Sequence, residues 1–315
     1  MSKVVVLGSL NMDVSIEADR IPSAGETLEG RDLLLGPGGK GANQAVASAR
    51  MGAETLMIGS VGSDLFGSEL IDSLAHAGVS TGYIKREAGD ATGTAVVIRS
   101  SGDNRIIVSQ GANHSLGVRE VGDALSVVAQ PDDILLTQLE CAPLVVWEAI
   151  RHAKSLGMFV VLNPSPAHAI PADILPQVDL LCLNETECSA VTGCQQDGEE
   201  SYRRSLEALI EGGAKRAVLT LGPRGSAALD ENGYYRIPAE RVAAVDTTGA
   251  GDTFVGTLSA FLSRGHELRE AMEFATKAAA LATTHIGAQG SIPTIEEVES
   301  AFGKDGENEW DTSNN

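Results

Sequence analysis

Hydrophobic residues along the chain fall into short continuous runs that alternate with longer runs of helical spacing. The run VVVLGSL (residues 4–10) is rich in β-branched residues, which is typical of a strand buried on both faces. ANQAVASARMG follows with helical spacing and stops at a glycine. TLMIGSVG and LFGSELIDSLAHAG then repeat the order of strand and helix.

The second half of the chain continues this alternation. PLVVWEAIRHAKSLG has a proline near its start and a glycine at its end, as helices often do. The expected strands are DILLTQL, MFVVLN, VDLLCLN, RAVLTLG and the strand-like RVAAV. Strands that alternate with helices predict an α/β fold, with a three-layer, doubly wound and mostly parallel sheet.

Two stretches, residues 12–36 and 89–111, break the pattern by alternating apolar and polar positions between turn residues. SSGDN is a turn signal within the second stretch, so both stretches predict hairpins with one solvated face. We interpret them as a small β-sheet lid over an α/β core formed by residues 1–11, 37–88 and 112–303. An ornament on the fold is the alternative. Residues 304–315 are polar and acidic, and we expect a flexible tail.

Charge and cysteine content bear on the partners and the compartment that we expect for this chain. The chain has 315 residues, of which 43% are hydrophobic, and carries 23 basic against 43 acidic residues for a net charge of −20. Such acidity disfavours nucleic acid and anionic membrane surfaces as partners. Four cysteines without a C-x-x-C pair and the lack of a signal peptide or an 18-residue apolar run favour a cytoplasmic protein with reduced thiols.

The stretch AVDTTGAGDTFVGTLSAFL (residues 244–262) places an acid among glycines at the start of a helix. Apolar residues then recur with the spacing of an amphipathic helix, as Phe254, Val255, Leu258, Phe261 and Leu262. A glycine-rich turn leaves free N–H groups at the helix N-terminus, where they can bind an anion, and Asp252 lies beside them. A carboxylate that takes a hydroxyl proton next to N–H groups that bind developing charge is the arrangement needed for phosphoryl transfer. Helix stabilisation by Asp252 is the simpler alternative.

A second glycine cluster, GPGGKGAN (residues 36–43), also matches G-x-G-x-x-G. A dinucleotide-dependent oxidoreductase is therefore an alternative, although Pro37 and Lys40 inside the motif count against it. The local interpretation is a loop whose backbone approaches a ligand closely. Ligands of open α/β sheets bind beyond the carboxyl ends of the strands. Polar residues at expected strand ends include Asn11, Asp13, Glu140, Asn163, Asn184, Glu187, Thr220 and Asp246.

Seven motifs occur in the order found in the ribokinase branch of the PfkB carbohydrate kinase family, which this chain resembles from about residue 4 to residue 302. They are GSLNMD, GPGGKGANQAVASARMGA, QLE, LNPSPA, LNETE, TLGPRG and VDTTGAGDTFVGT. The resemblance implies ATP-dependent phosphorylation of D-ribose at O5, giving ribose 5-phosphate and ADP. It also implies Mg²⁺, an activating monovalent cation (K⁺ in most members) and a homodimer paired through the lid sheet.

The resemblance further implies a role for individual positions. Asp252 is the expected catalytic base, next to an anion hole at Gly249, Ala250 and Gly251. The expected sugar ligands, besides Asp252, are Asn11, Asp13, Gly39, Lys40, Asn43 and Glu140. The expected ATP ligands are Asn184, Thr220, Gly222, Gly225, Gly251 and Thr276, with Glu187 organising Mg²⁺ through water. The expected monovalent-cation positions are Asp246, Thr248, Ala282, His285, Gly287 and Ser291.

Two departures from the family pattern stand out. Cys141 follows Glu140 where a small or apolar residue is common, and it either alters the pocket wall or is inert. His285 occupies a variable position, and a solvated loop histidine is the alternative role for it. A kinase for deoxyribose, fructose or a nucleoside and a non-catalytic sugar-binding relative remain alternatives to a ribose kinase.

Overall fold

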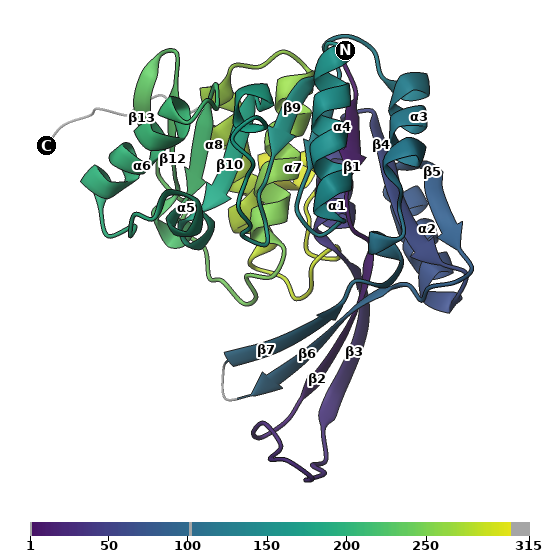
Figure 1. The fold of residues 1–315 in the computed structure, drawn as a ribbon. Coiled ribbons are helices and arrows are strands. Elements are labelled where there is room, and N and C mark those ends of the chain that lie inside the picture. Colours follow the sequence, from purple (N-terminus) through teal and green to yellow (C-terminus); the bar gives the residue numbers. More distant parts are fainter. Residues whose placement is uncertain (1, 101–102, 304–315) are drawn as a thin grey trace, which may run out of the picture.

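The computed structural model describes residues 2–100 and 103–303, and within them the chain forms a nine-stranded sheet with helices on both faces (Figure 1). This confirms the predicted three-layer α/β fold. In spatial order the large sheet contains β13 (Gly233–Ile237), β12 (Ser226–Asp230), β11 (Ala217–Thr220), β10 (Leu180–Asn184), β9 (Phe159–Leu162), β8 (Ile134–Thr137), β1 (Val4–Leu7), β4 (Thr55–Gly62) and β5 (Ser80–Glu87).

Strand β1 lies at the point where the direction of chain progression through the sheet reverses. It pairs in parallel with β4 on one side and with β8 on the other, and among the described strands of this sheet only the pairs β11–β12 and β12–β13 are antiparallel. Crevices at such switch points, beyond the carboxyl ends of the strands, are the usual ligand sites of this architecture. The residues just after β1 and β8 therefore have the best positions for binding a substrate.

Alternation within β1 divides the core into two layers. Val4 and Val6 belong to one buried cluster, and Val5 and Leu7 belong to the other. The first face is covered by α1 (Lys40–Arg50), α2 (Leu65–His76), α7 (Ala250–Ser263), α8 (Leu268–Ala282) and α9 (Ile295–Phe302). The second is covered by α3 (Val118–Val128), α4 (Pro143–Ser155), α5 (Glu185–Thr192) and α6 (Glu199–Glu211). Short 3₁₀ turns are η1 (Gly111–His114), η2 (Leu175–Gln177) and η3 (Gly222–Arg224).

A separate small sheet projects from the end of the core to which β1 leads (Figure 1). Its strands, in spatial order, are β3 (Arg31–Gly38), β2 (Asn11–Glu17), β6 (Gly93–Ser100) and β7 (Asp103–Ser109). The strands β2 and β3 form one antiparallel pair, β6 and β7 form the other, and β2 joins them by pairing in parallel with β6. The centre of the expected SSGDN turn, Ser101 and Gly102, and the expected tail lie outside the described residues.

Two local predictions are wrong. RVAAV (residues 241–245) is not a strand: it has no neighbouring strand to pair with, and its Val245 is 64% exposed. It is held instead by the N–H of Val245, which donates to the Thr283 carbonyl at 2.7 Å. Helix α7 is not amphipathic, because Thr253, Gly256 and Ser259 are buried as fully as its apolar residues. It is enclosed between the sheet and its neighbours α1 and α8, so it has no solvated face.

Within the described part of the chain, no helix is long and apolar enough to span a membrane. All four cysteines are free thiols, and Cys194 is exposed whereas the other three are buried. Cys141 lies in the hydrophobic core, where burial and the neighbouring Glu140 charge raise the pKa of its thiol to about 12. A thiol held in this form is chemically inert.

Candidate active site

The N-terminus of α7 is a site for an anion. Gly249 caps it in the left-handed conformation with φ of 77°, so the chain turns sharply into the helix at a position that favours glycine. The N–H of Ala250 donates to the Thr247 carbonyl at 3.3 Å. No described residue accepts a hydrogen bond from the N–H of Gly251 or of Asp252. Two unpartnered N–H groups and the positive end of the helix dipole therefore face outward together.

The Asp252 carboxylate is buried immediately beside these N–H groups, and side-chain amides fix it. Asn43 donates from Nδ2 to its Oδ2 at 2.9 Å, and Gln44 donates from Nε2 to its Oδ1 at 2.9 Å. Both amides come from the first turns of α1, which packs along α7. Each carboxylate oxygen keeps a lone pair with which it could accept a proton.

Glycines bring the other acidic groups close to this point. A side chain at Gly38 would meet the Asp13 carboxylate at 2.3 Å, and one at Gly39 would meet the backbone of Asn11 at 2.7 Å. Glu140, just beyond β8, accepts from Ser9 Oγ at 2.5 Å and from the Lys40 N–H at 3.1 Å. The loop GPGGKG is thus fastened at the switch point between β1 and β8.

Charges in this pocket act on one another. Burial, and then the charges of Glu140 and Asp252, raise the pKa of Asp13 to about 7. Burial by itself lowers the pKa of Lys40, but the carboxylates of Asp252, Glu140 and Glu187 outweigh it and raise that pKa. Lys40 therefore stays protonated at the centre of an acid-lined pocket, where it can offer a hydrogen-bond donor or a positive charge.

Asparagine acceptors and donors complete the side of the pocket near the small sheet. Asn11 is buried, and its Oδ1 accepts from Asn113 Nδ2 at 2.7 Å. Asn113 also accepts from the Leu10 N–H at 2.9 Å, so it clamps the point where the chain enters the small sheet. The Oδ1 atom of Asn43 is buried without a hydrogen-bond partner. An unpartnered acceptor beside the Asp252 carboxylate suits a ligand rich in hydroxyl donors.

Asp252 also lines a cavity of about 200 Å³, together with Lys40, Asn184, Glu187, Thr220, Gly251 and other residues. Asn184 caps α5 by accepting from the Glu187 N–H at 2.8 Å, and Glu187 Oε2 accepts from the Asn184 N–H at 3.0 Å and from Asn163 Nδ2 at 3.4 Å. The Oε1 atom of Glu187 has no donor among the described residues. One open carboxylate oxygen suits Mg²⁺ that is held mainly by phosphates and water. No group of three or more His, Cys, Asp or Glu in the described chain could itself hold a metal.

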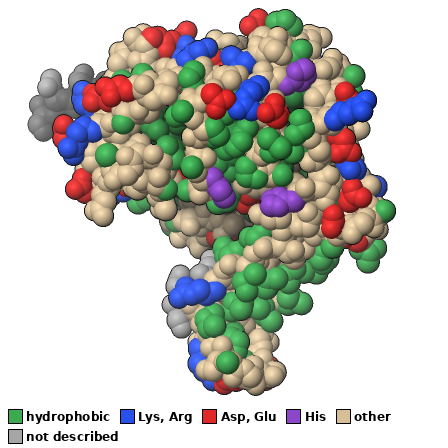
Figure 2. All heavy atoms as spheres, in the orientation of Figure 1, with side chains coloured by type: hydrophobic (Ala, Val, Ile, Leu, Met, Phe, Trp, Pro, Cys, Tyr) green, Lys and Arg blue, Asp and Glu red, His purple; other side chains and the backbone are tan. Residues whose placement is uncertain are grey.

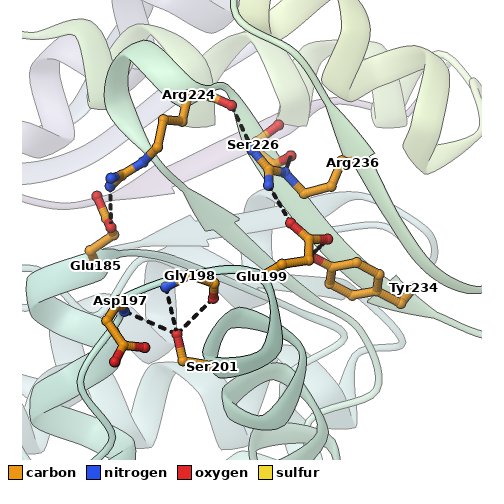
Figure 3. A network of polar contacts seen from close by, with 9 residues as sticks. All are labelled: Glu185, Asp197, Gly198, Glu199, Ser201, Arg224, Ser226, Tyr234 and Arg236. Atoms are coloured by element: carbon orange, nitrogen blue, oxygen red, sulfur yellow. Dashed lines mark hydrogen bonds and ion pairs between the residues drawn. The ribbon is translucent and has the colours of Figure 1, made fainter.

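Ion pairs and hydrogen bonds fix the loop after β11 (Figure 3). Gly225 turns it with φ of 88°, and Arg224 pairs with Glu185 in the first turn of α5. Arg236 donates to the Arg224 carbonyl at 2.7 Å and to Glu199 at 2.6 Å. These contacts pin the loop against α5, next to the Asn184 cap.

The remaining expected nucleotide positions are less close to the cavity. Thr220 lines it, whereas Gly222, Gly225 and Thr276 are not among its lining residues. Thr276 is buried on α8, and its hydroxyl has no partner, which leaves one hydrogen-bonding group for a nucleotide base. The structure brings together the phosphate side of the expected site more closely than the base side.

The expected cation positions come from two loops that meet at Asp246. Its Oδ1 accepts from the Thr248 N–H at 2.9 Å, and its Oδ2 accepts from the Gly287 N–H at 3.0 Å. Burial alone raises the pKa of Asp246, but a hydrogen bond from the Thr248 hydroxyl, the two N–H donors and the charge of Arg99 outweigh it and lower that pKa. Ala282 and Ser291 are buried, whereas His285 is exposed. Backbone carbonyls around an ionised carboxylate are oxygen ligands of the kind that an alkali cation takes. The His285 side chain is exposed, and the structure assigns it no role among these ligands.

Sequence reasoning missed several polar residues that the fold buries in the site. Gln44, Gln138, Ser9 and Asn113 are all within 1% of complete burial. Gln44 gave no signal because a polar residue within a helical run is usually a solvated one, and Asn113 gave none because it lies in a short turn between elements. The signal that could have revealed Gln44 is its place among small apolar residues, AN-Q-AVA, on a helix face that must pack against the core.

An anion-binding helix N-terminus, an amide-held carboxylate and a pocket of hydroxyl-binding groups at the switch point of an α/β sheet define a phosphotransferase that acts on an alcohol group. The model of the pfkB family of carbohydrate kinases matches residues 1–295. The chain belongs to this family and is a sugar kinase.

The chain is also similar to individual sugar kinases whose substrates are named. The chain is 36% identical over 301 residues to a ribokinase of Staphylococcus aureus (strain COL), covering 94% of this chain and 98% of the relative. It is 33% identical over 296 residues to a deoxyribokinase of Salmonella typhi, covering 93% and 96%. Among solved structures, an Arabidopsis thaliana ribokinase complexed with ribose and ATP aligns with a TM-score of 0.87 at 30% identity, covering 95% of this chain and 98% of that one.

Proposed function

We propose that this protein is an ATP-dependent kinase that phosphorylates D-ribose at O5 to give ribose 5-phosphate and ADP. The observation that carries the proposal is the Asp252 carboxylate, held by Asn43 and Gln44 beside the free N–H groups of Gly251 and Asp252. The ribokinase relatives and the neighbouring structure complexed with ribose and ATP support the choice of ribose and of ATP.

In this proposal, Asp252 accepts the proton of the sugar hydroxyl as that hydroxyl attacks the γ-phosphoryl group of ATP. The N–H groups at the start of α7 bind the charge that develops on the transferred phosphoryl group, with Gly249 shaping the turn. The N–H of Ala250 contributes less, since it already donates to Thr247. Lys40 lines the phosphate-side cavity as well as the sugar pocket, so it can stabilise the phosphoryl group in transit.

The sugar is held by acceptors and donors that line the pocket between the core and the small sheet. The proposed ligands are Asn11, Asp13, Gly39, Lys40, Asn43 and Glu140. ATP is held by Asn184, Thr220, Gly222, Gly225, Gly251 and Thr276. Mg²⁺, when bound at Glu187 through water, neutralises charge on the phosphates. K⁺ is the monovalent cation that we propose for Asp246, Thr248, Ala282, His285, Gly287 and Ser291, with His285 acting through its backbone.

A kinase for 2-deoxyribose is the second candidate, and the deoxyribokinase relative at 33% identity favours it over fructose or nucleosides. The two sugars differ by one hydroxyl, which acceptors such as Asp13 and Glu140 would bind. The test is ADP release with Mg-ATP and a panel of ribose, deoxyribose, fructose and nucleosides, each with Na⁺ and with K⁺. We expect the highest kcat/KM for ribose with K⁺, whereas a preference for another acceptor would reassign the sugar pocket. Absence of turnover with every acceptor would reject the kinase proposal.

We further propose that two copies pair through the small sheet. Register places Leu35, Val14, Val96 and Ile107 in one row across its four strands. In that row Leu35 and Ile107 are 59% and 69% exposed. Alternation puts this row on the face opposite Asp13, and apolar residues collect over this sheet in Figure 2. The division into core and lid, a lid role for the small sheet, and a cytoplasmic location, which the four free thiols suit, are parts of the same proposal.

A further inference from the structure

A chain of buried amides lies behind the Asp252 carboxylate. Gln44 is completely buried, and its Nε2 donates both to Asp252 Oδ1 at 2.9 Å and to Asn163 Oδ1 at 3.1 Å. Its Oε1 accepts from Nε2 of the completely buried Gln138 at 2.5 Å. We propose that Gln44, backed by Gln138, is a positioning residue that fixes the orientation of the catalytic carboxylate, an inference that rests on the function proposed above.

The direction of every hydrogen bond in this chain is determined. Asn163 Nδ2 donates to the Cys182 carbonyl at 2.9 Å, so its Oδ1 must face Gln44. Both Asn163 Oδ1 and the Asp252 carboxylate are acceptors, so only the NH₂ group of Gln44 can face them. The Gln138 amide then donates to the one remaining acceptor of Gln44. A flipped Gln44 would place its oxygen against two other oxygens, so the amide has a single stable orientation.

This arrangement connects three parts of the site. Helix α1 carries Lys40 and Asn43, which face the sugar pocket, and Gln44, which holds the base. Asn163 continues the contacts toward Glu187 on the phosphate side, at 3.4 Å. Gln138 comes from the segment just after β8, two residues before Glu140. The base is therefore oriented by the same elements that shape both substrate pockets.

Orientation matters because a base must lie within hydrogen-bond reach of the proton it takes. A displacement of about 1 Å costs up to about 100-fold in rate. Gln44 is completely buried, and its amide is occupied by Asp252, Asn163 and Gln138, so its loss should act through Asp252 and leave sugar affinity little changed.

The test compares Q44M with S48A. Methionine keeps the length of Gln44 but removes its amide. Ser48 lies one turn further along α1, is completely buried, and donates to the Gly256 carbonyl of α7 at 2.9 Å without contacting Asp252. S48A therefore removes a comparable buried contact between the same two helices.

We expect kcat to fall by about 10- to 100-fold in Q44M, with the sugar Kd within about threefold of wild type. S48A should stay within about twofold of wild type in kcat. Equal kcat losses in the two variants would overturn the proposal.

Two further variants, Q44E and Q138M, test the proposal if Q44M folds poorly. Q44E keeps the shape and places a second carboxyl group against Asp252, so we expect the acid limb of its kcat profile to move to higher pH, whereas S48A keeps the wild-type limb. Q138M should lower kcat less than Q44M, because the two N–H groups of Gln44 remain. An unmoved limb in folded Q44E would also overturn the proposal.

Crystal structures separate this inference from the proposed function. In Q44M or Q138M we expect the Asp252 side chain to leave its present position or to occupy two rotamers, and in S48A to keep one. That result would support the positioning role even if no sugar were phosphorylated. An unmoved Asp252 in Q44M would reject the positioning role even if ribose were the substrate.

Discussion

The two aspartates of the site, the buried Asp252 and the partly buried Asp13, lie close enough for their charges to interact but have different surroundings. Asp252 lies in the first turn of a core helix and accepts hydrogen bonds from two amides. Asp13 lies on the small sheet, accepts no hydrogen bond from the described part of the chain, and faces the charges of Glu140 and Asp252. One carboxylate is held by hydrogen bonds from the protein itself, and the other has none from the described residues. The difference matches the roles proposed above, with Asp252 in the chemistry and Asp13 in sugar recognition.

Removing the charge of Asp252 should have the largest effect. We expect D252N to lower kcat by about 10³- to 10⁴-fold or more, because a base contributes mainly in the transition state. Sugar affinity should fall far less, since the amide keeps one acceptor. Initial rates of ADP release and calorimetric sugar binding measure the two effects. Turnover near that of wild type would show that Asp252 is not the base.

Removing Asp13 should affect recognition more than chemistry. We expect D13A to raise the sugar KM by about 10- to 100-fold through loss of a partly buried acceptor, with kcat within about fivefold of wild type. Steady-state kinetics at saturating ATP measure both values. An unchanged KM would remove Asp13 from the sugar site and weaken the contrast with Asp252.

The titration of Asp13 predicts a pH dependence. Its pKa of about 7 means that it becomes protonated, and a weaker acceptor, as the pH falls below 7. We therefore expect kcat/KM for the sugar to decline below about pH 7 in wild type, and this limb to be absent from D13N. The folded chain binds this proton more tightly than the unfolded chain does, so wild type should gain thermal stability relative to D13N as the pH falls from about 7 towards 4. A limb that persists in D13N would assign it to another group.

A charge on the face of the small sheet opposite Asp13 should change the oligomeric state and have a smaller effect on activity. If two copies pair as proposed, we expect L35D to convert that dimer to a monomer, because a carboxylate in an apolar interface is costly to desolvate. Light scattering after size exclusion reports the mass, and L144D on the core helix α4 is a control because Leu144 is 64% exposed and does not belong to this sheet. Wild-type protein that is already monomeric would exclude this pairing surface.

The smallest effect concerns motion of the small sheet. If Asp13 receives its donors from the sugar, β2 and β6 should gain hydrogen-exchange protection when ribose binds, while β1 and β8 in the core change little. Exchange measured with and without ribose tests this. Equal protection in both states would favour the small sheet as an ornament rather than a lid.

The helices and strands that the sequence predicts well are those whose local pattern agrees with their surroundings. The strand VVVL and the helix PLVVWEAIRHAKS have continuous or helical apolar spacing and turn residues at their ends, and the structure contains both. RVAAV also contains β-branched residues, like the strand VVVL, and yet it forms no strand. A strand needs a neighbouring strand to pair with, and this segment has none. Composition cannot report which segments lie beside one another.

The sequence alone determined the alternating α/β architecture, the glycine turn before Asp252 and the set of candidate polar residues, since each depends on neighbours along the chain. The tertiary structure decided which of those residues meet. Only folding buries Gln44 against Asp252, 208 positions away, and surrounds Asp13 with carboxylates that raise its pKa. The physical reason is that hydrogen-bond direction and burial depend on distances in space, which the fold sets and which spacing along the chain does not contain.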